Sequence, residues 1–126
     1  MKKLFVLCLV LIGTLHAAGT APALKTDKFM LGEWENDIGY RQAVRVGNTL
    51  YVSGSVGGGE MPAAIREAYG ALEQTLRHYG LTFQHVVKEN IHTTKLDDLK
   101  SNLAIRRAFY GKDFPCLLYT SDAADE

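Results

Sequence analysis

Few stretches of this sequence have residue types and spacing that could do chemistry. The glycine-rich run at residues 54–59 precedes a helical pattern, and backbone N–H groups in such a run could hold an anion. The run lacks the Lys-Ser/Thr pair of a phosphate loop and the spacing of a dinucleotide fingerprint, so a flexible connection between a strand and a helix is favoured. Ser53-Gly54-Ser55 also lacks the pattern of a nucleophile elbow.

Neither metal nor nucleic-acid chemistry is indicated. His78, His85 and His92 are spaced by seven residues, and none has a close partner at metal-ligand spacing. Surface or capping roles are expected for the first two, while His92 lies on a predicted strand and could face a cleft. The 126 residues include 14 basic and 14 acidic ones. Nucleic acid is therefore not expected as a partner, because phosphate binding needs a clustered basic excess. We expect no metal and no cofactor.

The elements that would position any site begin with a predicted hairpin. Two β-rich runs, residues 42–46 and 49–53, flank Gly47-Asn48, a dipeptide that tolerates the positive φ angles of a tight primed turn. Apolar side chains fall on both faces of these strands. A sheet buried on both faces needs two covering layers, so helices are expected on one side and a partner subunit on the other.

Helical spacing predicts a helix at about residues 61–79, with Pro62 in its first turn and Gly80 as its C-terminal cap. A strand is expected at residues 86–93. A second helix should begin near Thr94, where residues 94–97 resemble a capping box, and end at Gly111. Arg106 and Arg107 suit the negative end of its dipole.

The two ends of the chain are expected to lie outside the domain. Residues 1–18 have a charged start, a short apolar run and small residues, a pattern that is typical of a cleaved secretory signal. An exported product, periplasmic or secreted, is therefore expected. After cleavage of the signal, no contact with the membrane is expected. Residues 19–37 form a leader that could pack along the sheet as an edge segment. Residues 116–126 show no strand alternation and resemble the translation of a transposase adapter from DNA sequencing libraries, so a non-native tail is favoured over a native acidic one. The two cysteines, Cys8 and Cys116, fall in these end segments, and no disulfide is expected.

Several short motifs occur in a characteristic order within residues 39–115. They are Gly39-Tyr40-Arg41-Gln42-Ala43-Val44, Gly47-Asn48, Tyr51-Val52-Ser53-Gly54, Val86-Val87-Lys88, Asn102 and Phe114-Pro115. With the element order β-β-α-β-α, they resemble the RidA family, also called YjgF or endoribonuclease L-PSP. The resemblance implies a chorismate-mutase-like α+β fold at residues 38–115, here with its last strands missing. It also implies a homotrimer with ligand clefts between subunits.

The resemblance further implies a hydrolase that deaminates reactive enamine and imine intermediates bearing a carboxylate. It places Tyr40, Ser53, Gly54 and Asn102 at the substrate; plain packing roles for Tyr40 and Asn102 have equal weight. The carboxylate-binding Arg of the family falls on Leu117, which leaves the catalytic residue unassigned and predicts that the chain as written is inactive. The alternative is a non-catalytic ligand-binding or interaction trimer of the same fold. Ribonuclease activity, which the family name suggests, gains no support from the neutral charge.

Overall fold

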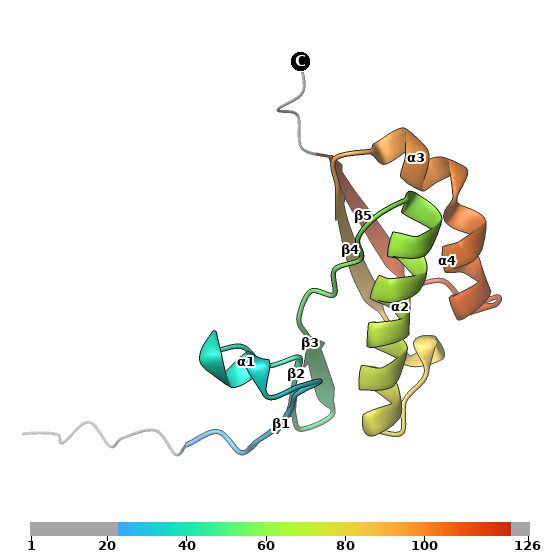
Figure 1. Ribbon diagram of the computed structural model, residues 1–126. Helices are drawn as coiled ribbons and strands as arrows, with labels where there is room; N and C mark the ends of the chain where they lie inside the picture. The colour runs from blue at the N-terminus through green and yellow to red at the C-terminus, as the bar shows by residue number, and fades with distance from the viewer. Residues whose placement is uncertain (1–22, 122–126) are drawn as a thin grey trace, which may run out of the picture.

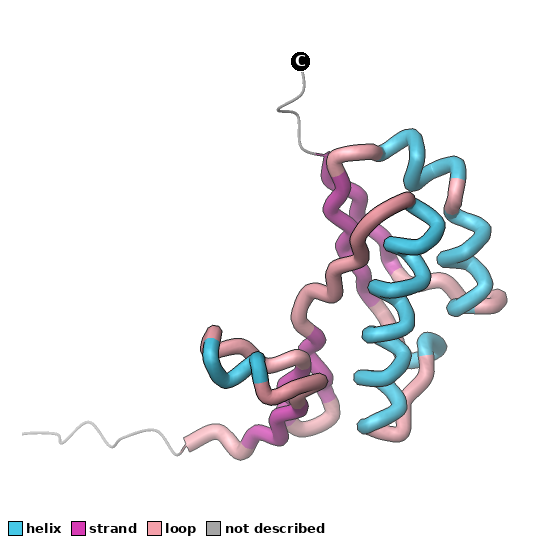
Figure 2. Tube along the Cα trace, in the orientation of Figure 1, coloured by secondary structure: helices cyan, strands magenta, loops and turns pink. Residues whose placement is uncertain are grey.

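The structure is a computed structural model that describes residues 23–121, so the predictions for residues 1–18 and for the last five residues of the tail lie outside it. Figures 1 and 2 show an α+β chain, which confirms the predicted fold class. The elements in chain order are β1 (Thr26–Phe29), α1 (Trp34–Asp37), β2 (Ala43–Val46), β3 (Thr49–Val52), α2 (Met61–His78), the 3₁₀ turn η1 (Phe83–His85), β4 (Lys88–Thr93), α3 (Leu96–Ser101), α4 (Leu103–Tyr110) and β5 (Cys116–Ser121).

The first sheet is antiparallel, in the order β1-β2-β3. Gly47-Asn48 joins β2 to β3, and Gly47 has a φ of 58°, which confirms the predicted hairpin. No residue other than glycine has a positive φ within residues 23–121, so the turn has a single left-handed residue. Strand β1 comes from the leader and pairs with β2 over Thr26–Phe29. The leader therefore forms an edge segment of the sheet, as expected.

The second sheet consists of β4 and β5, which run parallel. The prediction that residues 116–126 contain no strand is wrong, because Cys116–Ser121 pairs with β4 along its whole length. The backbone of β4 supplies hydrogen bonds to any neighbouring chain, and this pairing does not need a clear alternation in the added strand. The predicted strand at residues 86–93 starts two residues late, after the 3₁₀ turn at Phe83–His85.

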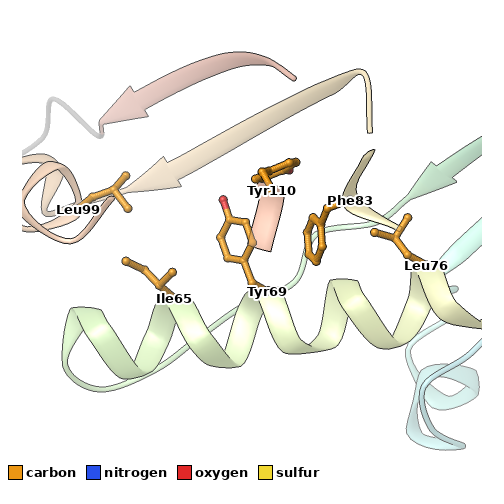
Figure 3. Packing of buried hydrophobic residues seen from close by; sticks show 6 residues of the cluster. All are labelled: Ile65, Tyr69, Leu76, Phe83, Leu99 and Tyr110. Carbon is orange, nitrogen blue, oxygen red and sulfur yellow. The ribbon is translucent and has the colours of Figure 1, made fainter. Parts of the chain in front are cut away.

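Helices α2 and α4 lie beside the β4–β5 sheet (Figure 1). Gly80 has a φ of 68° and follows the C-cap of α2, as predicted. Figure 3 shows side chains of α2 directed towards Tyr110 and Phe83 in the main core. That core contains Ile65, Tyr69, Leu76, Phe83, Leu99 and Tyr110, each at most 6% exposed.

The second predicted helix is divided into α3 and α4 at Asn102, which is a correction to the single helix expected. The predicted capping box also does not form. Helix α3 begins after Lys95 without a side-chain cap, and the Thr93 hydroxyl instead accepts a hydrogen bond from the Lys95 N–H. Gly111, with a φ of 69°, ends α4 as predicted. Within residues 23–121, no helix is both long and apolar enough to cross a bilayer.

Candidate functional site

Three of the four predicted ligand-binding residues meet at the end of the hairpin. The Tyr40 hydroxyl lies 2.9 Å from the carbonyl oxygen of Gly54 and 3.0 Å from Oε1 of Gln42, two acceptors that share its single proton. The Ser53 hydroxyl donates to the carbonyl oxygen of Arg41 at 2.7 Å. We call Tyr40, Gln42, Ser53 and Gly54 the strand-end site.

Gln42 and Trp34 support this strand-end site. The Gln42 side chain is buried, and its Nε2 donates to the Ser55 hydroxyl at 3.1 Å, which ties the site to the start of the glycine run. The Trp34 ring stacks on the Tyr40 ring with centroids 5.9 Å apart, although Trp34 remains 54% exposed. The phenol is therefore held at its hydroxyl and along one face, while the site as a whole stays close to solvent.

Glu35 is a buried carboxylate that sequence reasoning missed. Its Oε1 accepts from the Leu31 N–H at 2.7 Å and its Oε2 from the Gln42 N–H at 2.8 Å. Its own carbonyl oxygen accepts from the Tyr40 N–H at 2.8 Å. Glu35 thus fixes the backbone that carries Tyr40 and Gln42. No pattern in the short leader distinguishes this carboxylate from a surface one.

Asn102, the fourth predicted residue, does not join the strand-end site within one chain. It lies at the junction of α3 and α4, which Figure 1 shows on the opposite side of the molecule from α1. Its Nδ2 donates to the carbonyl oxygen of Asp98 at 2.9 Å. In a single chain this contact gives Asn102 the local packing role.

Leu117 occupies the position where the resemblance places an arginine. It is the register partner of Glu89, and laterally paired residues of neighbouring strands point to the same face. The Glu89 side chain reaches Tyr69 of α2 and Arg106 of α4, so this face is the one that the helices cover. Leu117 itself offers neither charge nor a hydrogen-bond donor.

Glu89 lies at the centre of a buried polar network that the sequence analysis also missed. Arg106 donates to its Oε2 from Nε at 3.0 Å and from Nη2 at 2.6 Å. The Tyr110 hydroxyl donates to the same oxygen at 3.0 Å, and the Tyr69 hydroxyl donates to Oε1. The guanidinium carbon lies 4.7 Å from the centroid of the Tyr110 ring. Arg106 is only 5% exposed, so its predicted role at the helix dipole is secondary to this ion pair.

Burial and charge together set the protonation of this network. Burial raises the pKa of both Tyr69 and Tyr110, and the neighbouring Glu89 carboxylate raises each pKa further. Burial alone would lower the pKa of Arg106, but the hydrogen bonds and charge of Glu89 outweigh it, and the pKa rises. The tyrosines are therefore neutral donors, and the Arg106 guanidinium stays charged. Alternation in β4 could have indicated the network, because Glu89 shares the inward face with Ile91.

A carboxylate of α2, that of Glu67, already accepts a hydrogen bond from the glycine run. The Gly58 N–H donates to Oε2 of Glu67 at 3.0 Å. A Cβ placed on Gly57 would lie 1.8 Å from the carbonyl oxygen of Ala64, so the run packs directly against the first turns of α2. The run therefore serves close packing, and its Gly58 N–H group is not free for a ligand.

The histidines do not form a metal site in the described structure. His85 accepts from the Thr82 N–H at 3.1 Å, which is the capping role expected of it. His78 stacks on Phe29 with ring centroids 4.0 Å apart. Residues 23–121 contain no group of three or more His, Cys, Asp or Glu side chains placed to hold a metal ion.

Comparisons with known proteins find one family whose model and solved structures match most of this chain. The model of the endoribonuclease L-PSP family matches residues 30–119. Rv2704 from Mycobacterium tuberculosis, described as a member of the YjgF/YER057c/UK114 family, is 27% identical with a TM-score of 0.71, over 79% of this chain and 86% of that chain.

Two further solved structures share the fold. NMB1025 from Neisseria meningitidis, a YjgF family member, is 16% identical with a TM-score of 0.67, over 82% of this chain and 85% of its own. YyfA from Yersinia pestis, of the Rid family, is 21% identical with a TM-score of 0.63, over 68% of this chain and 75% of its own. No curated protein sequence matches this chain.

Proposed function

This chain belongs to the endoribonuclease L-PSP family, also named YjgF or Rid, and from that premise we propose that it binds small carboxylate-bearing imines or related ligands without hydrolysing them. The ligand lies at the strand-end site, where Tyr40, Ser53 and Gly54 offer polar groups near solvent. A small site of this kind holds a ligand by a few placed hydrogen bonds.

The observation that carries the proposal is Leu117 at the position of the family arginine. A guanidinium does lie beside the strand-end site, that of Arg41, but its Nη1 already donates to the carbonyl oxygen of Tyr40 at 2.6 Å. Hydrolysis of an imine needs the substrate held while water attacks the carbon and nitrogen leaves as ammonia. A planar guanidinium holds a carboxylate in two parallel hydrogen bonds, and leucine supplies none.

The proposal includes a homotrimer with clefts between subunits and an exported product. Exposed apolar side chains on β3 support the assembly, since Tyr51 is 63% and Val52 is 37% exposed in the single chain. The distance of Asn102 from the strand-end site also supports it, because a neighbouring subunit could supply that amide. Light scattering of the purified protein tests the trimer, and intact mass of the exported product tests removal of residues 1–18.

Hydrolytic deamination of enamines and imines is the second candidate function. Family membership favours this function, as does the contact of the Tyr40 hydroxyl with the carbonyl oxygen of Gly54 at the strand end Ser53-Gly54. It requires a cation at the cleft, and a missing charge-assisted contact of this kind costs roughly two to three decades in rate. If the chain is a deaminase, an arginine restored at position 117 should raise the rate of ammonia release by roughly two to three decades.

The test measures ammonia release from freshly generated 2-iminopropanoate. The unmodified chain should release ammonia at the background rate, while 2-oxopropanoate, the hydrolysis product, should still shift the NMR signals of Tyr40 and Gly54. Leu117→Arg is compared with Leu118→Arg, which adds the same charge at an exposed position one residue along β5. Turnover by the unmodified chain that falls in Tyr40→Phe would refute binding without hydrolysis. A gain in Leu117→Arg alone would favour the deaminase.

A further inference from the structure

A cleft with a volume of about 410 Å³ lies between α4, β5 and the segment that joins them. This volume is within the range of sites for small molecules. The cleft shares no residue with the strand-end site. Its lining combines two arginines with apolar and aromatic side chains: Leu103, Arg106, Arg107, Phe114 and Tyr119.

The two arginines contribute differently to the cleft. The Arg106 side chain is 6% exposed and is held by Glu89 through Nε and Nη2, so its charge is balanced and its position is fixed. Arg107 is exposed, and its guanidinium forms no hydrogen bond or ion pair with any residue in the described part of the chain. One positive charge at the cleft is therefore not neutralised by the protein.

Aromatic rings form the remaining wall. Phe114 is 52% exposed, and its ring centroid lies 6.3 Å from that of Tyr110, which itself carries the guanidinium of Arg106 on its face. Tyr119 is half-buried and packs against the core from β5. A large exposed phenylalanine next to an unpaired arginine offers an apolar surface and a positive charge side by side.

We propose that this cleft binds a small aromatic carboxylate, whose ring lies against Phe114 and Tyr119 and whose carboxylate meets Arg107. A planar guanidinium suits a carboxylate, and aromatic rings prefer offset or edge contacts with other rings. The buried Arg106–Glu89 pair acts as a rigid support for the wall. This binding function is independent of the strand-end site and of the proposed chemistry there.

The experiment titrates the full chain with 2-naphthoate and follows its fluorescence, with 2-naphthamide as the uncharged analogue. Arg107→Met keeps the length of the side chain and removes its charge. Arg66→Met makes the same change on α2, at an exposed residue outside the cleft. Removing one charge-assisted contact should weaken 2-naphthoate binding by about tenfold or more in Arg107→Met and leave Arg66→Met unchanged.

Three further measurements make the test decisive. Phe114→Ser should weaken both 2-naphthoate and 2-naphthamide, because it removes the ring contact, whereas Arg107→Met should affect only 2-naphthoate. Tyr40→Phe should leave both affinities unchanged, which separates this cleft from the strand-end site. Circular dichroism confirms that each variant is folded. Equal weakening in Arg107→Met and Arg66→Met, or no saturable binding to the unmodified chain, would overturn the proposal.

Discussion

Replacing Glu89 with glutamine tests whether the buried network stabilises the fold. The substitution keeps the shape of the side chain and removes its charge, so no cavity complicates the result. Glu89 currently accepts four hydrogen bonds, two from Arg106 and one each from Tyr69 and Tyr110. In Glu89→Gln the guanidinium stays buried without a counter-charge, and an amide N–H₂ faces donors that need an acceptor.

The expected loss is large because the pair is buried. Removing one partner of a buried ion pair costs about 3–5 kcal/mol, whereas a domain of this size is stable by only about 5–15 kcal/mol. The melting temperature should therefore fall by roughly 15–30 °C. A matched control is available in Glu73, which pairs with Arg77 at 2.8 Å, close to the 2.6 Å of the Arg106–Glu89 pair. The Glu73 and Arg77 side chains are 41% and 73% exposed, so Glu73→Gln should cost under about 1 kcal/mol.

Urea and thermal unfolding followed by far-UV circular dichroism measure both variants against the unmodified chain. The reasoning requires Glu89→Gln to lose several times more stability than Glu73→Gln. If the two variants lose similar amounts, both below about 1 kcal/mol, burial of the pair does not determine its contribution, and the network is not a source of stability.

Three further predictions concern the rest of the chain. Glu35→Gln should cost about 1–3 kcal/mol and speed amide exchange at Gln42, because one of two buried backbone donors then faces an amide N–H₂. Burial and the Glu89 carboxylate raise the pKa of Tyr69 and of Tyr110 above the usual value of 10.0, so the folded chain binds these protons more tightly than the unfolded chain. Stability should be unaffected by these groups below pH 10 and fall above it, and the share of the 295 nm absorbance that comes from these two phenols should rise only as the chain unfolds. Val52→Lys should shift the mass measured by light scattering from that of the proposed trimer towards that of a monomer, since Val52 is an exposed apolar residue on the edge strand β3 of the single chain.

Local signals in the sequence predicted the elements that depend on near neighbours. Gly47-Asn48 between two β-rich runs specified the hairpin, and Pro62 with Gly80 bounded α2 to within one residue. Tyr40, Ser53 and Gly54 of the strand-end site were predicted from the resemblance to the family, and not from a local pattern in the sequence. Their positions follow from the pairing of β2 with β3, which a short sequence window contains.

Long-range contacts determined what the sequence did not predict. Strand β5 forms because β4 is available to pair with it, and the weak pattern of residues 116–121 carries no sign of that partner. Glu89 and Arg106 are 17 residues apart and each looks like a surface charge until β4 and α4 pack together. The break at Asn102 is likewise set by contacts that helical spacing alone does not contain.

The glycine run connects the strand-end site to α2, and its geometry explains two of its glycines, Gly57 and Gly59. Residues 53–60 connect β3, in the first of the two sheets, to α2. Gly57 lies so close to the carbonyl of Ala64 that any side chain would force the backbone apart, and Gly59 has a φ of 77°, which other residues rarely adopt. The Gly58 N–H is meanwhile held by Glu67 of α2. The end of β3, and with it the backbone carbonyl that holds the Tyr40 hydroxyl, is therefore positioned by α2 as well as by the hairpin.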